Sequence, residues 1–162
     1  YLFFPMVILT LTYFGFIEEE KGRALGWAIV IMNIIATVIY VLFPVSTYWW
    51  RQELLANKME GNLFAETMYF YYENETSFNC FPSMHAGMST MCFFTWYQYY
   101  QLHQDSKTRN IAVVTFIITA GVILSTLFVK QHYIVDEIAG IFLAYVVGKL
   151  VFHRSSAWQT EQ

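Results

Sequence analysis

The sequence has few charged residues for its length. Among its 162 residues, nine are Lys or Arg and twelve are Asp or Glu, so 13% are charged, whereas an ordinary soluble domain has about 25%. This shortage argues against a soluble globular protein. The chain also has no block of basic residues, and its net charge is −3. It therefore lacks the electrostatic footprint of a protein that binds DNA or RNA.

Cysteine is scarce as well. Cys80 and Cys92 are the two cysteines, which is too few for a disulfide scaffold. Because Cys92 lies inside an apolar stretch, we expect no bridge between them. The sequence also lacks the basic segment and small-residue cleavage site of a signal peptide. It begins at Tyr1, within an apolar run and without Met, so we expect the first helix to be incomplete.

Apolar and aromatic residues dominate what is present. They make up 57% and 20% of the chain, and the mean hydropathy is +0.41. The charges form short clusters, and the runs between them are about as long as the 20 residues that a helix needs to cross the hydrocarbon core. Five runs are predicted as spans: 1–17, 25–50, 83–102, 110–129 and 134–152. The predicted fold class is therefore all-α, a polytopic membrane helical bundle with about five transmembrane helices in a single domain over residues 1–162.

The connection between the second and third spans has a mixed character. Residues 51–82 combine acidic and basic side chains with leucines and aromatic residues. Such a mixture predicts an interfacial amphipathic helix rather than a free linker.

The distribution of Lys and Arg predicts an orientation. If the spans alternate, six basic residues lie on one side: Lys21, Arg23, Lys107, Arg109, Lys149 and Arg154. Three lie on the other side: Arg51, Lys58 and Lys130. The side with more basic residues is usually cytoplasmic. We therefore predict a multi-pass integral membrane protein in which connections 51–82 and 130–133 lie on the extracytoplasmic side.

The polar residues beside the apolar runs gather on that same side. Ionisable groups at membrane depth are costly and usually mark function. Alternation of the spans places seven of these residues at one face: Arg51, Ser83, His85, Ser125, Lys130, His132 and Asp136. We expect the functional site there.

The first of two short segments opens the third span. In Phe81-Pro82-Ser83-Met84-His85, Pro82 suits the first turn of a helix, and Ser83 lies beside unpaired backbone N–H groups. Such a helix start attracts phosphate, and His85 lies where it can donate a proton. The same residues are also typical of an ordinary capped helix start.

The second segment, residues 130–136, opens the fifth span. His132 and Asp136 are four residues apart, so they share a helical face if the helix already includes His132. The carboxylate can then fix one ring nitrogen and leave the other as nucleophile or base. The alternative is a helix start where Asp136 and Glu137 complement the dipole and Lys130 extends to water. Combined with Arg51, whose planar fork suits phosphate, these residues indicate a phosphoryl site without metal.

These motifs resemble those of the type 2 phosphatidic acid phosphatase superfamily. Its Pro-Ser-Gly-His motif is similar to Pro82-Ser83-Met84-His85. Its Ser-Arg, five residues, His, three residues, Asp motif is similar to Ser125-Thr126 followed by His132 and Asp136. The resemblance covers about residues 42–148.

Departures from these motifs point to a divergent branch. Thr126 replaces the motif Arg. Arg51 is the nearest match to the first motif, Lys, six residues, Arg-Pro, but Gln52 follows it and Pro44 stands in the Lys position. The pattern resembles the branch with Phe-Pro-Ser-x-His and Lys-x-His-Tyr-x-x-Asp, which is also similar to inositol-phosphorylceramide and sphingomyelin synthases.

The resemblance implies a lipid phosphatase that uses no metal or cofactor. In that reading His132 attacks phosphorus to form a phosphohistidine, Asp136 orients His132, and His85 protonates the leaving group. The implied phosphate-binding residues are Arg51, Lys130, Ser83 and Ser125. The implied partners are membrane lipids, with a lipid phosphate or pyrophosphate as substrate. Three alternatives stay open: a phosphotransferase between lipids, a membrane protein that binds metal through His85, His132 and Asp136, and a transport protein without catalysis.

Overall fold

The computed structural model describes residues 2–48, 52, 63–74, 79–129 and 131–159. Within these ranges the chain forms six α-helices and a short 3-10 helix, with no β-strand. In chain order they are α1 (Phe3–Phe16), α2 (Glu19–Leu42), α4 (Leu63–Asn74), α5 (Met84–His103), α6 (Ser106–Phe128), α7 (Ile134–Arg154) and η1 (Ser156–Trp158). The all-α prediction is confirmed.

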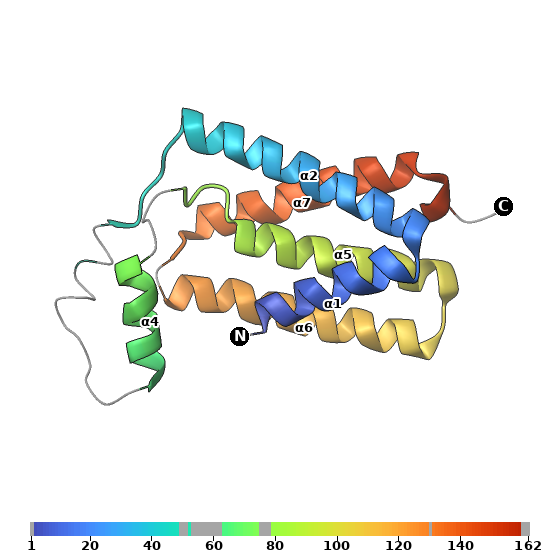
Figure 1. Cartoon of the computed structure of the whole chain (residues 1–162), viewed down its shortest axis with the longest axis horizontal. Coiled ribbons are helices and arrows are strands. Elements are labelled where there is room, and N and C mark those ends of the chain that lie inside the picture. Colours follow the sequence, from blue (N-terminus) through green and yellow to red (C-terminus); the bar gives the residue numbers. More distant parts are fainter. Residues whose placement is uncertain (1, 49–51, 53–62, 75–78, 130, 160–162) are drawn as a thin grey trace.

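Five of the helices form a bundle in which successive helices run in opposite directions. Figure 1 shows α1, α2, α5, α6 and α7 lying side by side, with α4 across one end. That end collects the last turn of α2, the first turn of α5, the last turn of α6 and the first turn of α7. The candidate motifs lie on these turns, so the alternation of the helices brings them to one end of the bundle.

The helix α6 packs through small side chains and exposes large apolar ones. The buried face of α6 consists mainly of threonine and alanine: Thr108, Ala112, Thr115, Thr119, Val122 and Thr126. Its outward face carries Val113, Phe116, Ile117 and Leu124, each more than half exposed. Small residues between helices and large apolar residues outside are typical of helices that pack within a membrane.

Two of the described helices, α2 and α6, are long and apolar enough to cross a membrane. The apolar helix α1 is shorter, with 14 residues. The number of five spans stays a prediction.

Three helix boundaries differ clearly from the sequence prediction. The helix α2 begins at Glu19 rather than at residue 25, because its first turns include charged residues that a count of uncharged residues leaves out. The helix α2 ends at Leu42, well before residue 50, because Pro44 disfavours helical backbone at the residue before it. The helix α6 begins at Ser106 rather than at residue 110, because Asp105 caps it by accepting the N–H groups of Lys107 and Thr108. The hydroxyl of Thr108 and these backbone donors hold the pKa of the Asp105 carboxyl below its usual value.

The connection between α2 and α5 contains the expected helix, α4. The hydroxyl of Tyr72 on α4 donates a hydrogen bond to the carbonyl of Val129, which attaches α4 to the end of α6. The interfacial position of this helix stays a prediction. Cys80 and Cys92 are both buried, and no disulfide joins them.

Candidate active site

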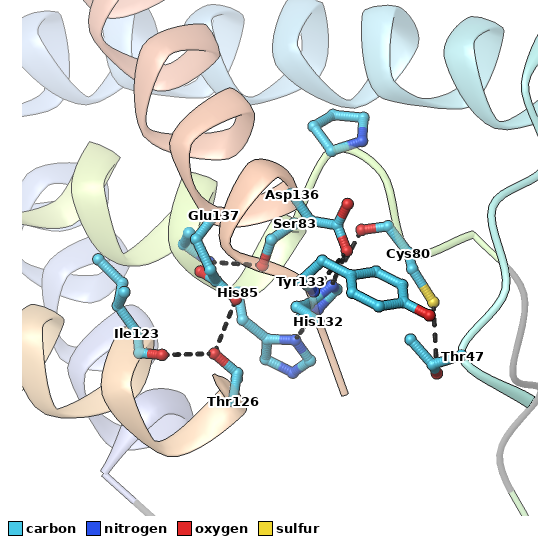
Figure 2. A network of polar contacts seen from close by, with 12 residues as sticks. Thr47, Cys80, Ser83, His85, Ile123, Thr126, His132, Tyr133, Asp136 and Glu137 are labelled. Carbon is cyan, nitrogen blue, oxygen red and sulfur yellow. Dashed lines mark hydrogen bonds and ion pairs between the residues drawn. The ribbon is translucent and has the colours of Figure 1, made fainter. Parts of the chain in front are cut away.

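Two histidines from separate helix starts face each other at the end of the bundle. Nδ1 of His85 lies 3.4 Å from Nε2 of His132, although the residues are 47 positions apart. His85 comes from the first turn of α5, and His132 lies just before α7. Figure 2 shows the two rings pointing toward each other.

A backbone carbonyl orients the ring of His132. Its Nδ1 lies 2.9 Å from the carbonyl oxygen of Cys80, and this contact is buried. A carbonyl accepts only, so the hydrogen-bond network assigns the proton to Nδ1. The neutral ring then directs the lone pair of Nε2 toward His85.

His132 and Asp136 would share a helical face only if the helix already included His132, and the structure shows that it does not. The helix α7 begins at Ile134 with Tyr133 as its N-cap residue, so His132 lies outside it. Oδ2 of Asp136 accepts the backbone N–H of Tyr133 at 2.8 Å and lies 3.7 Å from Nδ1 of His132. That separation allows charge attraction but exceeds hydrogen-bond distance. The carboxylate therefore caps α7, and the hydrogen bond of the ring goes to Cys80.

Ser83 connects the starts of α5 and α7. As the N-cap of α5, it accepts the N–H of Ala86 at 3.3 Å through its hydroxyl oxygen. Its own N–H donates to the carbonyl of Asp136 at 2.9 Å. Pro82 was expected within the first helical turn, but it lies before the cap, in a cis peptide bond with Phe81. Because Ser83 is the N-cap, the helix α5 begins at the next residue, Met84.

Gly140 allows the backbones of α5 and α7 to touch at this point. A Cβ built on Gly140 would lie 2.2 Å from the carbonyl oxygen of Ser83. This distance is far shorter than any real Cβ contact, so only glycine fits. The close approach keeps the first turn of α5, with His85, against the first turn of α7.

Ser125 lies near His85 but uses its hydroxyl within its own helix. Its Oγ donates to the carbonyl of Val122 at 2.8 Å. Together with His85, Thr126 and Gln131, Ser125 lines a cavity of about 880 Å³. Arg51 and Lys130, the two predicted phosphate-binding cations, lie outside the described residues.

The sequence reasoning missed Glu137 as a member of this site. Glu137 is buried, with 2% of its surface exposed, and its Oε1 accepts a hydrogen bond from the hydroxyl of Thr126 at 2.8 Å. Its other oxygen, Oε2, is buried without a hydrogen-bond partner among the described residues. Figure 2 shows Glu137 beside Ser83 and Thr126. The available signal in the sequence was its place next to Asp136 in the first turn of a helix. Acidic residues are common in first turns because they interact favourably with the helix dipole, so this signal did not distinguish Glu137.

Two further neighbours of the histidines were also missed. The carbonyl of Cys80 leaves no trace in the sequence, because every residue has one. The ring of Phe3 lies 5.1 Å from the ring of His85 between centroids, and its distance along the chain gave no hint of this contact.

The described side chains do not form a metal centre. Within the described ranges, no group of three or more His, Cys, Asp or Glu residues is arranged to hold a metal ion. The metal-binding alternative therefore has no support from the geometry of this part of the chain.

The fold and the site together define a helical membrane protein with paired imidazoles at one end of its bundle. A family model described as the PAP2 superfamily matches residues 1–150, and the chain belongs to this superfamily. This confirms the family resemblance of the motifs. No curated protein and no solved structure matches the chain. Membership points to a phosphatase-type activity on lipid phosphates.

Proposed function

We propose that this protein hydrolyses a lipid phosphate or pyrophosphate through a phosphohistidine formed on His132. The observation that carries the proposal is the pairing of Nε2 of His132 with Nδ1 of His85 at 3.4 Å. An imidazole with its Nδ1 proton fixed by a carbonyl presents a free lone pair to phosphorus. A second imidazole beside it is suited to move protons.

The proposed reaction has two steps. First, Nε2 of His132 attacks phosphorus while the bond from phosphorus to the leaving oxygen breaks, and His85 in its protonated form gives that oxygen a proton. Second, water attacks the phosphohistidine while His85 takes a proton from the water. The N–P bond then breaks, and phosphate leaves. General acid–base help of this kind contributes about 10²–10⁴ to a rate.

Stabilisation of the phosphoryl oxygens is assigned to three groups of residues. The start of α5 at Ser83 offers backbone N–H groups and the positive end of a helix dipole. Arg51 and Lys130 are proposed as the cations, and Ser125 as a further donor once it leaves its bond to Val122. Charge on the equatorial oxygens is where phosphoryl transfer gains most from the protein. Asp136, 3.7 Å from Nδ1 of His132, favours a positive charge on that ring as the reaction proceeds.

Substrate binding requires His85 to move. Reactive geometry places phosphorus about 3–3.5 Å from the attacking atom, which is where Nδ1 of His85 lies in the structure. His85 also lines the 880 Å³ cavity, so its ring has space to turn into. We expect the phosphoryl group to enter between the two rings.

The test uses the purified protein with a panel of lipid phosphates and pyrophosphates, scoring free phosphate against newly formed phospholipid. His132→Ala should abolish turnover, because the ring is the nucleophile, and should lower the free energy of unfolding by only about 1–3 kcal/mol, because it removes the buried hydrogen bond to the Cys80 carbonyl. His153→Ala, near the other end of α7, is the matched control and should keep wild-type turnover. Phosphate on an acid-labile, alkali-stable bond at residue 132 should accumulate during turnover.

The outcomes separate the alternatives. Turnover by His132→Ala would remove the nucleophile assignment. New phospholipid in place of free phosphate would make the protein a phosphotransferase. No turnover of any lipid by the wild-type protein would count against catalysis altogether.

A further inference from the structure

A cavity opens beside His85, between the start of α1 and the second half of α6. Its volume is about 880 Å³, within the range of pockets that hold small molecules. The polar lining consists of His85, Ser125, Thr126 and Gln131. The rest of the wall is apolar and includes Phe3 from α1 and Ile117 from α6.

The cavity leads away from the histidines along the axis of the bundle. On α6 its lining runs from Thr126, at the end with the site, back to Ile117. Nine residues of helix correspond to about 14 Å. The shape is therefore a groove with a polar end at His85 and an apolar end farther along α6.

Gly121 lies in the wall of this groove and leaves it open. A Cβ built on Gly121 meets no atom within 4 Å, so the helix surface has room for a side chain at this position. A large residue here would fill space that is now part of the groove.

We propose that this groove, named here the α1–α6 groove, binds the apolar chain of the substrate, and that Gly121 allows a long chain to enter. The assignment rests on the proposed function. In that reaction His85 protonates the leaving oxygen, and that oxygen belongs to the group that carries the apolar chain. His85 is itself part of the groove wall. The leaving oxygen that it protonates would therefore lie where the groove begins.

The chemistry of the wall agrees with such an occupant. Ile117 and Phe4, both lining residues, are 62% and 64% exposed, and a bound apolar chain would cover them. The ring of Phe3 lies against His85, so the chain would pass an aromatic ring as it leaves the site. The polar side chains are confined to the end where the phosphoryl group reacts.

The experiment compares water-soluble alkyl phosphates of increasing chain length, from butyl to dodecyl phosphate, with the full chain in lipid nanodiscs. Gly121→Phe is compared with Gly26→Phe on α2, where a Cβ also meets no atom within 4 Å. Each variant is measured against the wild type with the same probe, so partitioning of the probe into the bilayer cancels. Gly121→Phe should lower kcat/KM for dodecyl phosphate at least ten-fold and leave butyl phosphate within two-fold. Gly26→Phe should leave both unchanged.

A second variant tests the direction of the groove. This variant is Ile117→Trp. Residue 117 is one helical turn farther from His85 than residue 121, and the two positions are about 6 Å apart along α6. Each methylene that leaves water for an apolar wall should raise kcat/KM about four-fold, until the groove is full. The plateau should come at a shorter chain for Gly121→Phe than for Ile117→Trp.

Two failures are distinguishable. If the wild type hydrolyses both probes and Gly121→Phe changes neither, or lowers both equally, the groove is not the chain site and the proposed function stands. If the wild type hydrolyses none of the alkyl phosphates or lipid phosphates, the proposed function fails and the groove assignment fails with it.

Discussion

The contact between Thr126 and Glu137 shows how one altered residue changes this site. The hydroxyl of Thr126 lies 2.8 Å from the carbonyl of Ile123 and 2.8 Å from Oε1 of Glu137. It also lies 3.2 Å from the carbonyl of Val122. A hydroxyl has a single proton, so it cannot donate to all three oxygens. At position 126 the superfamily motif has Arg. This chain has a neutral hydroxyl there, which hydrogen-bonds to the buried carboxyl group of Glu137.

This arrangement predicts different effects for two substitutions of Glu137. Glu137→Gln keeps a group that can hydrogen-bond to Thr126, so thermal stability and turnover should stay within a few-fold of wild type. Glu137→Ala removes the partner and leaves a cavity, so it should lower the free energy of unfolding by about 1–3 kcal/mol. Thermal unfolding and lipid phosphatase assays on both variants measure these effects. Equal destabilisation by the two would contradict the hydrogen-bond explanation. A large loss of turnover by Glu137→Gln alone would show that the carboxyl group itself is needed.

At the scale of the elements, the site depends on the approach of α5 to α7. Ser83 donates its N–H to the carbonyl of Asp136, and Gly140 permits this contact by having no side chain. The first turn of α5 carries His85. The first turn of α7 carries Asp136, which caps this helix directly after the segment that contains His132. The distance between the imidazoles is therefore set by backbone packing, not by the histidines alone.

We expect Gly140→Ala to separate these helix starts. The added methyl group would meet the Ser83 carbonyl at 2.2 Å, and overpacking of this kind costs about 1–3 kcal/mol. Turnover should fall together with thermal stability, because the rings move apart. Gly26→Ala is the control: its Cβ meets no atom within 4 Å, and replacing a helical glycine by alanine generally stabilises by about 0.5–1 kcal/mol. Wild-type stability in Gly140→Ala would show that the helices have room to shift.

At the scale of the whole molecule, the two ends of the bundle carry different segments of the chain. Figure 1 places α4 and the starts of α5 and α7 at one end, and the α5–α6 connection at the other. The distribution of Lys and Arg predicts that the end with the site is extracytoplasmic. Large apolar residues such as Trp27, Ile34 and Val38 face outward along α2, as expected for contact with lipid.

Cysteine labelling in intact cells tests this orientation. Glu66→Cys on α4 should react with a membrane-impermeant maleimide before permeabilisation, and Gln104→Cys in the α5–α6 connection only after it. The native Cys80 and Cys92 are buried, so the unmodified protein serves as the unlabelled control. Reaction of both positions from the same side would contradict the alternation of the spans. The reverse order would place the site in the cytoplasm.

Much of the fold follows from local features of the sequence. Runs of apolar residues predicted the bundle helices, because a helix that crosses a membrane is defined mainly by the length of its own apolar stretch. The errors fell at helix ends, where Pro44 stops α2 and Asp105 starts α6 early. Capping and proline effects act on one or two residues, so a count of uncharged residues does not register them.

The sequence by itself determined that the chain is an all-α bundle and that His85 and His132 lie near helix starts at the same end of it. These features depend only on the hydropathy of each run and on the alternation of successive helices. Only the tertiary structure decided that the Cys80 carbonyl orients His132, that Glu137 is buried against Thr126, and that α5 touches α7 at Gly140. The contacts of the Cys80 carbonyl with His132 and of Ser83 with Gly140 join residues far apart in the chain, and both involve a backbone carbonyl, which every residue has. Their existence depends on how the helices pack against one another.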